Sequence, residues 1–426
     1  MDHATPARFL AAHEATAIAP ILALALSPTA QRLHQQLPPP RANLQVSIII
    51  PAKDEALGLP ATLAALADQT DLAGQPLPAG CFEVLVLANN CTDATAEVVR
   101  QQTHRWPNLV LHVAEIELPT AQAHVGRARR LLMDEACSRL ELAGGTGIIA
   151  STDADTRVAP TWVAAIMAEV AAGADAVGGR ISTEYEDDDQ SELRSLRLTQ
   201  TRDAAYRLLC ARLEHAIDPA PADPWPRHHQ HFGASLAITT RAYRRVGGLP
   251  EVRFLEDEAL CQRLRMHDLA LRHSPYVQVL TSARREGRVE VGLSWQLREW
   301  LHMCQQQREP HVESPGQLAA QWRLRCQLRA HWANGARYRP EEMATGLGVS
   351  VAMLQGQVWQ ATTFGLLWEW ALAKAPGLRV DMVPLSRALQ ELPLLIRSCA
   401  PVVAESLTEF SVSPASRAGT FHAVAR

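Results

Sequence analysis

The stretch Gly147-Ile148-Ile149-Ala150-Ser151-Thr152-Asp153-Ala154-Asp155 decides the fold of this chain. It predicts a short buried strand, too brief for a helix, which follows a Gly-Gly-Thr-Gly turn and ends in two aspartates. Side chains alternate along a strand, so Asp153 and Asp155 point the same way if the extension continues. Two crowded carboxylates repel each other unless a cation lies between them, and Mg²⁺ or Mn²⁺ takes such oxygen ligands. The alternative is a loop in which Asp155 or Thr156 caps the helix after Pro160.

Strands and helices alternate on both sides of this stretch. Apolar strand patterns cover residues 46–50, 82–87, 109–113 and 176–181, and helical patterns cover residues 59–68, 94–102, 125–142, 162–172 and 190–215. This alternation predicts a parallel sheet with helices on both faces. Such sheets bind ligands beyond the carboxyl ends of their strands. The clusters Lys53-Asp54-Glu55, Asn89-Asn90 and Asp153-Ala154-Asp155 all fall at those ends, which predicts a binding site.

A proline-rich segment, residues 216–226, leads to a cluster of histidines at positions 228, 229 and 231. For these side chains a polar loop, or contact with a hydroxylated ligand, is favoured over metal ligation. A strand at 234–238 and a helix at 241–246 follow. Three acids, Glu256-Asp257-Glu258, then open a helix over 259–266. They either offset the helix dipole or hold a general base near a substrate hydroxyl.

Composition narrows the class of protein. The chain has 426 residues and a formal net charge of −4, which gives no indication of a nucleic-acid partner. Its eight cysteines show no zinc-ligand spacing, so we expect reduced thiols in a cytoplasmic protein. No segment approaches the length of a membrane helix, and no basic n-region of a secretory signal opens the chain.

Three regions are expected along the chain. Residues 1–44 form an N-terminal extension that ends in a stiff proline-rich linker. Residues 45–291 form the α/β domain. From Leu293 the pattern becomes one of successive helices whose tryptophans are interpreted as core, so residues 292–426 form a helical C-terminal appendage.

Four motifs in order resemble those of family 2 glycosyltransferases. They are "VSIIIPAKDE" (46–55), "VLANNCTDATAEVV" (86–99), "STDADT" (151–156) and "LEDEAL" (255–260), with "FGASLAITTRAYRRVGGLPE" (232–251) upstream of the last. The resemblance covers residues 45–290. It implies a Rossmann-like αβα sandwich of the nucleotide-diphospho-sugar transferase type, the GT-A fold.

The resemblance also implies roles for individual residues. Asp155 and Asp153 hold the Mg²⁺ or Mn²⁺ that stabilises the departing diphosphate. Asp257 takes the proton of the acceptor hydroxyl and Glu256 flanks it, so inversion at the anomeric carbon is expected. Among Arg127, Arg129 and Arg130, we assign Arg129 to the donor phosphates, although a solvated helix face is an equal alternative. The donor side further comprises Pro51, Ala52, Lys53, Glu55, Asn89 and Ala154, and the acceptor side comprises Trp225, His228, Gly233 and Ala234.

Three departures from the family pattern bear on function. Ala88 stands at the first Asp of the second-strand turn and Asn89 at the second, so the base of the nucleotide stays open between UDP- and GDP-sugars. Asp54 replaces the family's Asn. The histidine expected as a further metal ligand is absent from residues 279–284, and Arg284 or Arg288 is placed to meet the phosphates instead, which would loosen the metal requirement. The sequence "QLREW" (296–300) resembles a motif of processive synthases with its arginine one place early, and we reject that function because membrane helices are lacking.

The leading hypothesis is a metal-dependent, inverting glycosyltransferase with a small-molecule or lipid-linked acceptor. A retaining enzyme of the same fold is the first alternative, and a non-catalytic nucleotide-sugar-binding scaffold is the second. A homodimer is left open.

Overall fold

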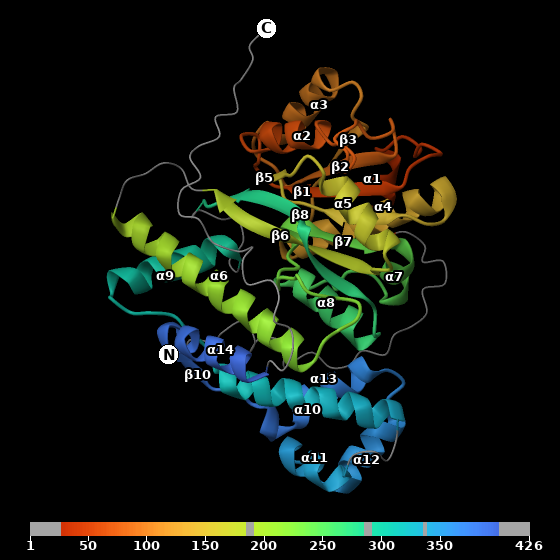
Figure 1. Ribbon diagram of the computed structural model, residues 1–426. Coiled ribbons are helices and arrows are strands. Elements are labelled where there is room, and N and C mark those ends of the chain that lie inside the picture. Colours follow the sequence, from red (N-terminus) through yellow and green to blue (C-terminus); the bar gives the residue numbers. More distant parts are fainter. Residues whose placement is uncertain (1–26, 185–190, 285–291, 335–338, 400–426) are drawn as a thin grey trace.

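The computed structural model describes residues 27–184, 191–284, 292–334 and 339–399. An eight-stranded sheet lies between two layers of helices, and the C-terminal helices gather below it (Figure 1). The strand order is β3-β2-β1-β4-β7-β6-β8-β5. The strands are β1 (Val46–Ala52), β2 (Phe82–Asn89), β3 (Leu111–Ile116), β4 (Ile148–Ser151), β5 (Thr156–Val158), β6 (Ala176–Glu184), β7 (Leu236–Thr239) and β8 (Leu271–Ser282). The expected α/β sandwich with a helical C-terminal region is confirmed.

Both faces of the sheet are covered by helices because the buried strands are apolar on both sides. Along β1, Val46, Ile48 and Ile50 pack toward the layer of α2, α3 and α5, whereas Ile49 packs toward the layer of α1, α4, α7 and α8. The bounds are α1 (Pro28–Gln35), α2 (Leu59–Ala67), α3 (Thr95–Arg105), α4 (Val125–Gly144), α5 (Trp162–Ala171), α7 (Thr240–Arg245) and α8 (Glu256–Met266). Because helices cover both faces, a ligand can reach the sheet only at the ends of its strands.

The prediction of a parallel sheet holds for β1–β4 and for the pair of β6 and β8, and it is wrong for β5 and β7. Strand β1 pairs in parallel with β2 and β4, and β2 with β3. Strand β7 is antiparallel to both β4 and β6, and β5 is antiparallel to β8. The pattern of apolar residues predicts which strands are buried, but it does not predict the direction in which each strand runs. As a consequence, β7 begins at the edge where β1, β2 and β4 end.

Strand β8 is the longest strand of the sheet and was not predicted. Its Pro275 lies within the strand, and proline in a strand pattern argues against a strand unless it sits at an edge or a bulge. The pairing of β6 with β8 shifts register between Gly179 and Arg180, opposite this part of β8. The bulge therefore accommodates the proline, and β8 runs on in parallel to β6 until Ser282.

A buried ion pair joins the sheet to α4. Arg139 donates from Nε and Nη2 to the two carboxylate oxygens of Glu83 on β2, at 2.8 and 2.7 Å, and both side chains are 1% exposed. Ser47 of β1 donates to the same carboxylate at 2.9 Å. The charge of Glu83 is thus fully partnered inside the sandwich.

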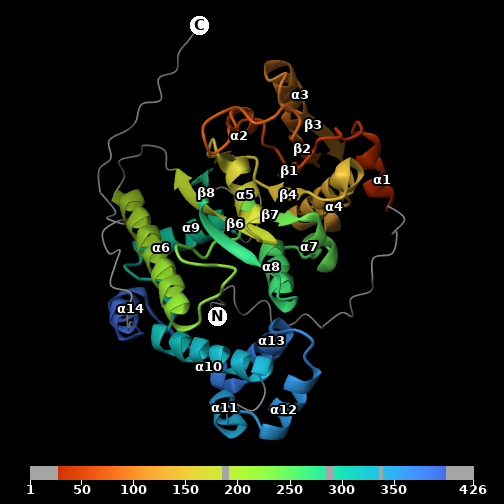
Figure 2. The same ribbon diagram turned by 45° about the vertical axis from the view of Figure 1, so that its right-hand side comes forward.

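The C-terminal region wraps around α6 (Ser191–Ile217). Its elements are α9 (Leu293–Gln305), β9 (His311–Glu313), α10 (Pro315–Asn334), α11 (Pro340–Leu347), α12 (Val351–Gln360), α13 (Phe364–Lys374), β10 (Met382–Pro384) and α14 (Leu385–Cys399). Helices α10 and α14 and strand β9 form one apolar cluster with α6, and α9 forms another with it. Figure 2 shows α10–α13 below α6 and α8. The region is therefore packed against the α/β part, and the proposed boundary at residue 291 stays a prediction.

Helix α13 also meets the end of α8. Asp268, just after α8, accepts from the amides of Phe364 and Gly365, both at 2.8 Å. A Cβ at Gly365 would lie 1.8 Å from the carbonyl oxygen of Arg265, so only glycine permits this approach. The helix that begins with the predicted general base thus ends against the C-terminal helices.

The predicted absence of disulfides and membrane helices can be compared with the structure. The eight cysteines are free thiols. Among the described helices, none combines the length and the hydrophobicity that a membrane crossing requires. Residues 1–26 of the predicted extension, 400–426 of the appendage, and Arg288 lie outside the described residues.

Candidate active site

One cavity of about 2590 Å³ is lined by every residue that the sequence assigned to the site. The cavity is large compared with the roughly 300–1,000 Å³ typical of small-molecule sites. The assigned residues are Pro51, Ala52, Lys53, Glu55, Asn89, Arg129, Asp153, Ala154, Asp155, Trp225, His228, Gly233, Ala234, Glu256 and Asp257. The carboxyl groups at the end of β4 and at the start of α8 therefore open onto the same space.

Sheet topology explains why these residues meet. Strands β1, β2 and β4 end at one edge of the sheet. Because β7 is antiparallel to β4, the segment before it, with Gly233 and Ala234, begins at the same edge. Strand β8 is parallel to β6 and ends there too, which brings Arg284 to the site. The sequence predicted β7 as a strand but not its antiparallel direction, and that direction joins the two halves of the cavity.

Asp153 and Asp155 lie in a turn after β4 and not in a continued strand. The Thr156 amide donates to the Asp153 carbonyl oxygen at 3.2 Å, which closes the turn. Burial raises the pKa of Asp153. Burial, together with the neighbouring Asp153 charge, raises the pKa of Asp155 to about 6. Both carboxylates are therefore held at an electrostatic cost that an added cation would relieve.

Arg129 of α4 connects the two acidic groups. Its Nη2 donates to Asp153 Oδ1 at 2.7 Å, and its Nη1 donates to Glu256 Oε1. The guanidinium lies against Gly233, where a Cβ would come within 2.4 Å of Arg129 Cζ. Of the three arginines considered from the sequence, only Arg129 lines the cavity. Arg127 pairs with Glu251, and Arg130 pairs with Asp134.

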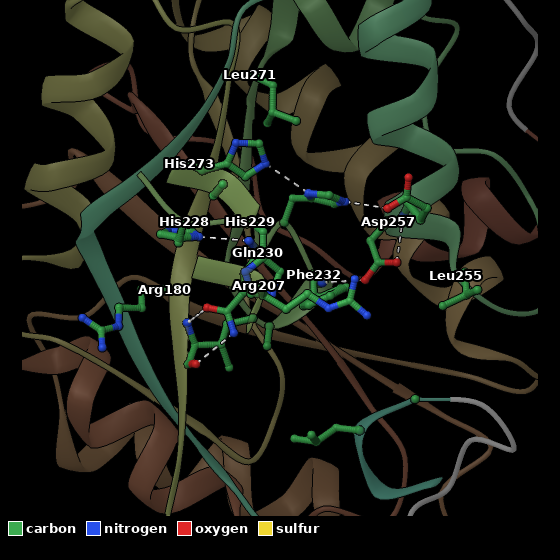
Figure 3. A pocket seen from close by; sticks show the side chains of 18 of the residues that line it. Arg180, Arg207, His228, His229, Gln230, Phe232, Leu255, Asp257, Leu271 and His273 are labelled. Atoms are coloured by element: carbon green, nitrogen blue, oxygen red, sulfur yellow. Dashed lines mark hydrogen bonds and ion pairs between the residues drawn. The ribbon is translucent and has the colours of Figure 1, made fainter. Parts of the chain in front are cut away.

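Asp257 is fixed by main-chain amides at both oxygens. Gly233 N donates to Oδ2 and Glu258 N donates to Oδ1, each at 2.8 Å. Leu255 precedes the helix in the left-handed region at φ 57°, a costly conformation for a leucine, and turns the chain into α8. The three acids predicted just before the helix form its first turn. The carboxylate of Asp257 is thereby held at the cavity wall, where Figure 3 shows it beside Phe232 and Leu255.

A chain of charged side chains behind Asp257 was not anticipated from the sequence. Glu258 Oε2 lies 2.6 Å from His231 Nε2, His231 Nδ1 lies 3.1 Å from His273 Nε2, and His273 Nδ1 lies 2.7 Å from Asp223 Oδ2. Although burial opposes it, the hydrogen bond from His231 lowers the pKa of Glu258. The hydrogen bond from His273 likewise lowers the pKa of Asp223 against the effect of burial. Each of these three contacts needs one ring N–H as its donor, so the two carboxylates and the two imidazoles hold one another in position.

The residues assigned to the acceptor differ in what they can offer. His228 is engaged on both sides, since Gln230 N donates to its Nδ1 at 2.9 Å and its Nε2 lies 3.0 Å from the Ser274 carbonyl oxygen. Burial lowers the pKa of His228 to about 3, so the ring is neutral. Trp225 presents a ring that carries the Arg212 guanidinium 5.6 Å from its centroid. Trp225 is the more accessible contact of the two.

The turns after β1 and β2 hold each other in place. Asp54, at φ 53°, accepts from Thr92 N at 2.6 Å, which lowers its pKa. Asp93 accepts from the Ala56 and Thr95 amides. Asp54, Cys91 and Asp93 are the only three-residue group within metal-binding distance among the described residues. These three side chains form hydrogen bonds with main-chain groups of the two turns, which gives the group a structural role. Lys53 and Asn89, in the same turns, line the cavity.

Arg284 lies at the opposite wall of the donor side. Its two terminal nitrogens donate to Glu55 at 2.8 and 2.5 Å, and Nη2 also lies 3.1 Å from Asp155 Oδ2. The sequence had placed this arginine near the phosphates. The structure puts it on the acids that would surround them.

Comparison with known proteins identifies part of the chain. Residues 47–221 match the family model described as glycosyl transferase family 2. This match to a family 2 glycosyltransferase domain spans less than half of the chain. The expectation that the protein is a glycosyltransferase is thereby confirmed. Asp257 and Arg284 lie beyond the matched residues, and the comparison with curated proteins gives no match.

Several solved structures are similar to the glycosyltransferase. The mannosyltransferase PcManGT from Pyrobaculum calidifontis, in complex with GDP-Man and Mn²⁺, has 19% identity and a TM-score of 0.39, covering 81% of this chain and 92% of that one. S. aureus TarS 1-349 in complex with UDP-GlcNAc has 14% identity and a TM-score of 0.39, covering 83% and 91%. Glucosyl-3-phosphoglycerate synthase from Mycobacterium tuberculosis, with Mn²⁺, UDP and phosphoglyceric acid, has 16% identity and a TM-score of 0.35, covering 68% and 88%.

Proposed function

We propose that this glycosyltransferase moves a sugar from a nucleoside diphosphate donor, a UDP- or GDP-sugar, to an acceptor hydroxyl with Asp257 as the general base. The observation that carries the proposal is the single cavity onto which Asp153, Asp155 and Asp257 open. Its volume leaves room for an acceptor beside the donor. The acceptor is a small molecule or a lipid-linked one.

A divalent cation fits the residues at the end of β4. Asp155 would hold Mg²⁺ or Mn²⁺, with Asp153 beside it, and burial raises the pKa of both carboxyl groups, so a bound cation would favour their ionised forms. Two carboxylates suffice, because Mg²⁺ commonly completes its shell with water and substrate phosphates. When bound, the ion would stabilise charge on the departing diphosphate.

The protein's own residues perform the remaining tasks. The amides of Gly233 and Glu258 orient Asp257, whose oxygens keep further lone pairs to accept the acceptor's proton. Arg129 offsets the charges of Asp153 and Glu256, so that neither opposes the approach of an anionic donor. Attack from the side opposite the leaving diphosphate gives inversion.

The test is turnover of a panel of UDP-, GDP- and dTDP-sugars with Mn²⁺, comparing the wild type with Asp257→Asn. We expect the variant to lose 10²–10⁴-fold in rate, the usual contribution of a general base, and to keep donor binding. Asp203→Asn is the matched control, because Asp203 lines the same cavity on α6 beside Arg207.

Equal turnover by wild type and Asp257→Asn removes Asp257 from the mechanism. Donor binding without turnover in the wild type supports the scaffold alternative. The anomeric configuration of the product, read by NMR, separates an inverting enzyme from a retaining one.

A further inference from the structure

Two arginines pair with the two aspartates after β4, and their surroundings differ. Arg129 serves Asp153, whereas Arg284 serves Asp155 and Glu55. Arg129 is 4% exposed and is also bound to Glu256. The Arg284 side chain is 34% exposed and stands two residues after the end of β8. Asp153 therefore has a buried partner, Arg129, whereas the partner of Asp155, Arg284, is more exposed and lines the cavity.

Arg284 is already in contact with Asp155, since its Nη2 lies 3.1 Å from Asp155 Oδ2. Its guanidinium already forms a two-pronged contact with a carboxylate, that of Glu55, and the same geometry suits a phosphate. A divalent ion that takes Asp155 must compete with this guanidinium. A diphosphate bound beside Asp155 would instead give the Arg284 guanidinium a second anionic partner, whose oxygens suit the same two-pronged contact.

We propose that Arg284 is a built-in counter-cation of the donor site, which holds Asp155 and Glu55 until a donor arrives and then turns its hydrogen bonds to the diphosphate. The inference rests on the proposed function and adds two consequences to it. A nucleoside diphosphate binds without any divalent ion, because Arg284 supplies positive charge. A divalent ion alone binds weakly, because Arg284 competes for Asp155.

Arg284→Gln tests both consequences. Binding of GDP and of UDP is measured by calorimetry in EDTA, and binding of Mn²⁺ alone is measured by electron paramagnetic resonance. We expect the variant to lose at least tenfold in affinity for the preferred diphosphate in EDTA and to gain severalfold in affinity for Mn²⁺. Charged hydrogen bonds of this kind support changes of that size.

Arg157→Gln is the matched control. Arg157 lies on the adjacent strand β5, pairs with Glu184, and does not line the cavity, so both affinities should stay at the wild-type values. Arg284→Lys keeps the charge and loses the two-pronged geometry, and should fall between wild type and Arg284→Gln. It also provides the comparison if Arg284→Gln folds poorly, as checked by its melting curve.

An unchanged affinity in either measurement overturns the inference. Weaker Mn²⁺ binding by Arg284→Gln also overturns it, because Arg284 would then organise the acids and not compete for them. Both results leave the proposed function intact as long as wild type binds a diphosphate with Mn²⁺. If wild type binds neither GDP nor UDP under any condition, the donor site itself is wrong and the inference fails with it.

Discussion

Glu256 is a buried carboxyl group in the site, and burial disfavours its ionised form. It is 3% exposed, and burial raises its pKa to about 7 even though Arg129 favours the ionised form. The reference value is 4.5. Between about pH 4.5 and pH 7 the folded protein thus holds a proton that the unfolded chain has released. The free energy of unfolding therefore depends on the protonation of Glu256, the residue beside the proposed base Asp257.

We expect Glu256 to make the protein less stable as pH rises from 4.5 to 7, with little further effect above 7. The slope is at most about 1.4 kcal/mol per pH unit, the value for one proton. Glu256→Gln should remove this component, as measured by urea unfolding at pH 5, 6, 7 and 8. Glu251→Gln is the control, since Glu251 is half-exposed. A wild-type slope that persists in Glu256→Gln contradicts the prediction.

At this scale the sequence predicted the composition of the cavity well and its hydrogen bonding poorly. Asp153, Asp155 and Asp257 follow strands or open a helix, and such positions are visible in a pattern. The contact between His231 and His273 is not visible, because 42 residues separate the two rings and only the fold brings them together. The choice of Arg129 over its neighbours likewise depends on the direction in which each side chain leaves α4.

Among the elements, strands were predicted where their residues alternate and missed where the pairing is irregular. Strand β1 was predicted within two residues of its observed end. Strand β8 was missed because Pro275 interrupts the pattern, and β5 because three residues give no periodic signal. The direction of β7 depends on the long connection through α6 and cannot be obtained from the strand itself. These misses account for the incorrect prediction of an all-parallel sheet.

The ion pair between β2 and α4 gives a prediction for the stability of the sandwich. Arg139→Leu leaves the Glu83 carboxylate buried without its partner, which should cost about 3–5 kcal/mol in chemical unfolding. The double variant Glu83→Gln/Arg139→Leu should recover part of that loss, because the buried charge is removed. Arg244→Leu on α7 breaks a half-exposed pair with Glu141 of α4 and should cost below about 1 kcal/mol. Similar losses in all three variants would show that the charge of Glu83 is not the cause.

In the whole molecule, the C-terminal helices contribute side chains to the cavity that Asp153 and Asp257 also line. Arg325 and Arg329 of α10 pair with Asp218 at the end of α6. Trp322 and Trp368 line the same cavity as Asp257. The sequence predicted these tryptophans as core, and both are 8% exposed. Their position at the cavity could not be predicted, since it depends on how α10 and α13 dock.

The hydrogen bonds of Asp268, which lies just after α8, should stabilise the first turn of α13. Asp268→Ala removes two hydrogen bonds to the first turn of α13, which should cost about 1–2 kcal/mol. Amide hydrogen exchange should therefore accelerate about tenfold over residues 364–371 and stay unchanged in β1–β4. Asp71→Ala is the control, because Asp71 accepts two amides within its own surface turn. Acceleration spread evenly over the protein would contradict a local junction.

The reversal of the chain at β7 limits how this enzyme could be recombined with another. The segment matched to the family ends at residue 221, before β7 returns the chain to the open edge of the sheet. A chimera joined at that point would carry Asp153 and Asp155, the proposed donor side, from one parent and Asp257, the proposed base, from the other. Arg129 would then pair with Asp153 of its own parent, and in place of Glu256 it would meet the corresponding residue of the other parent. Exchange of the whole unit from β1 through α8 keeps both contacts of Arg129.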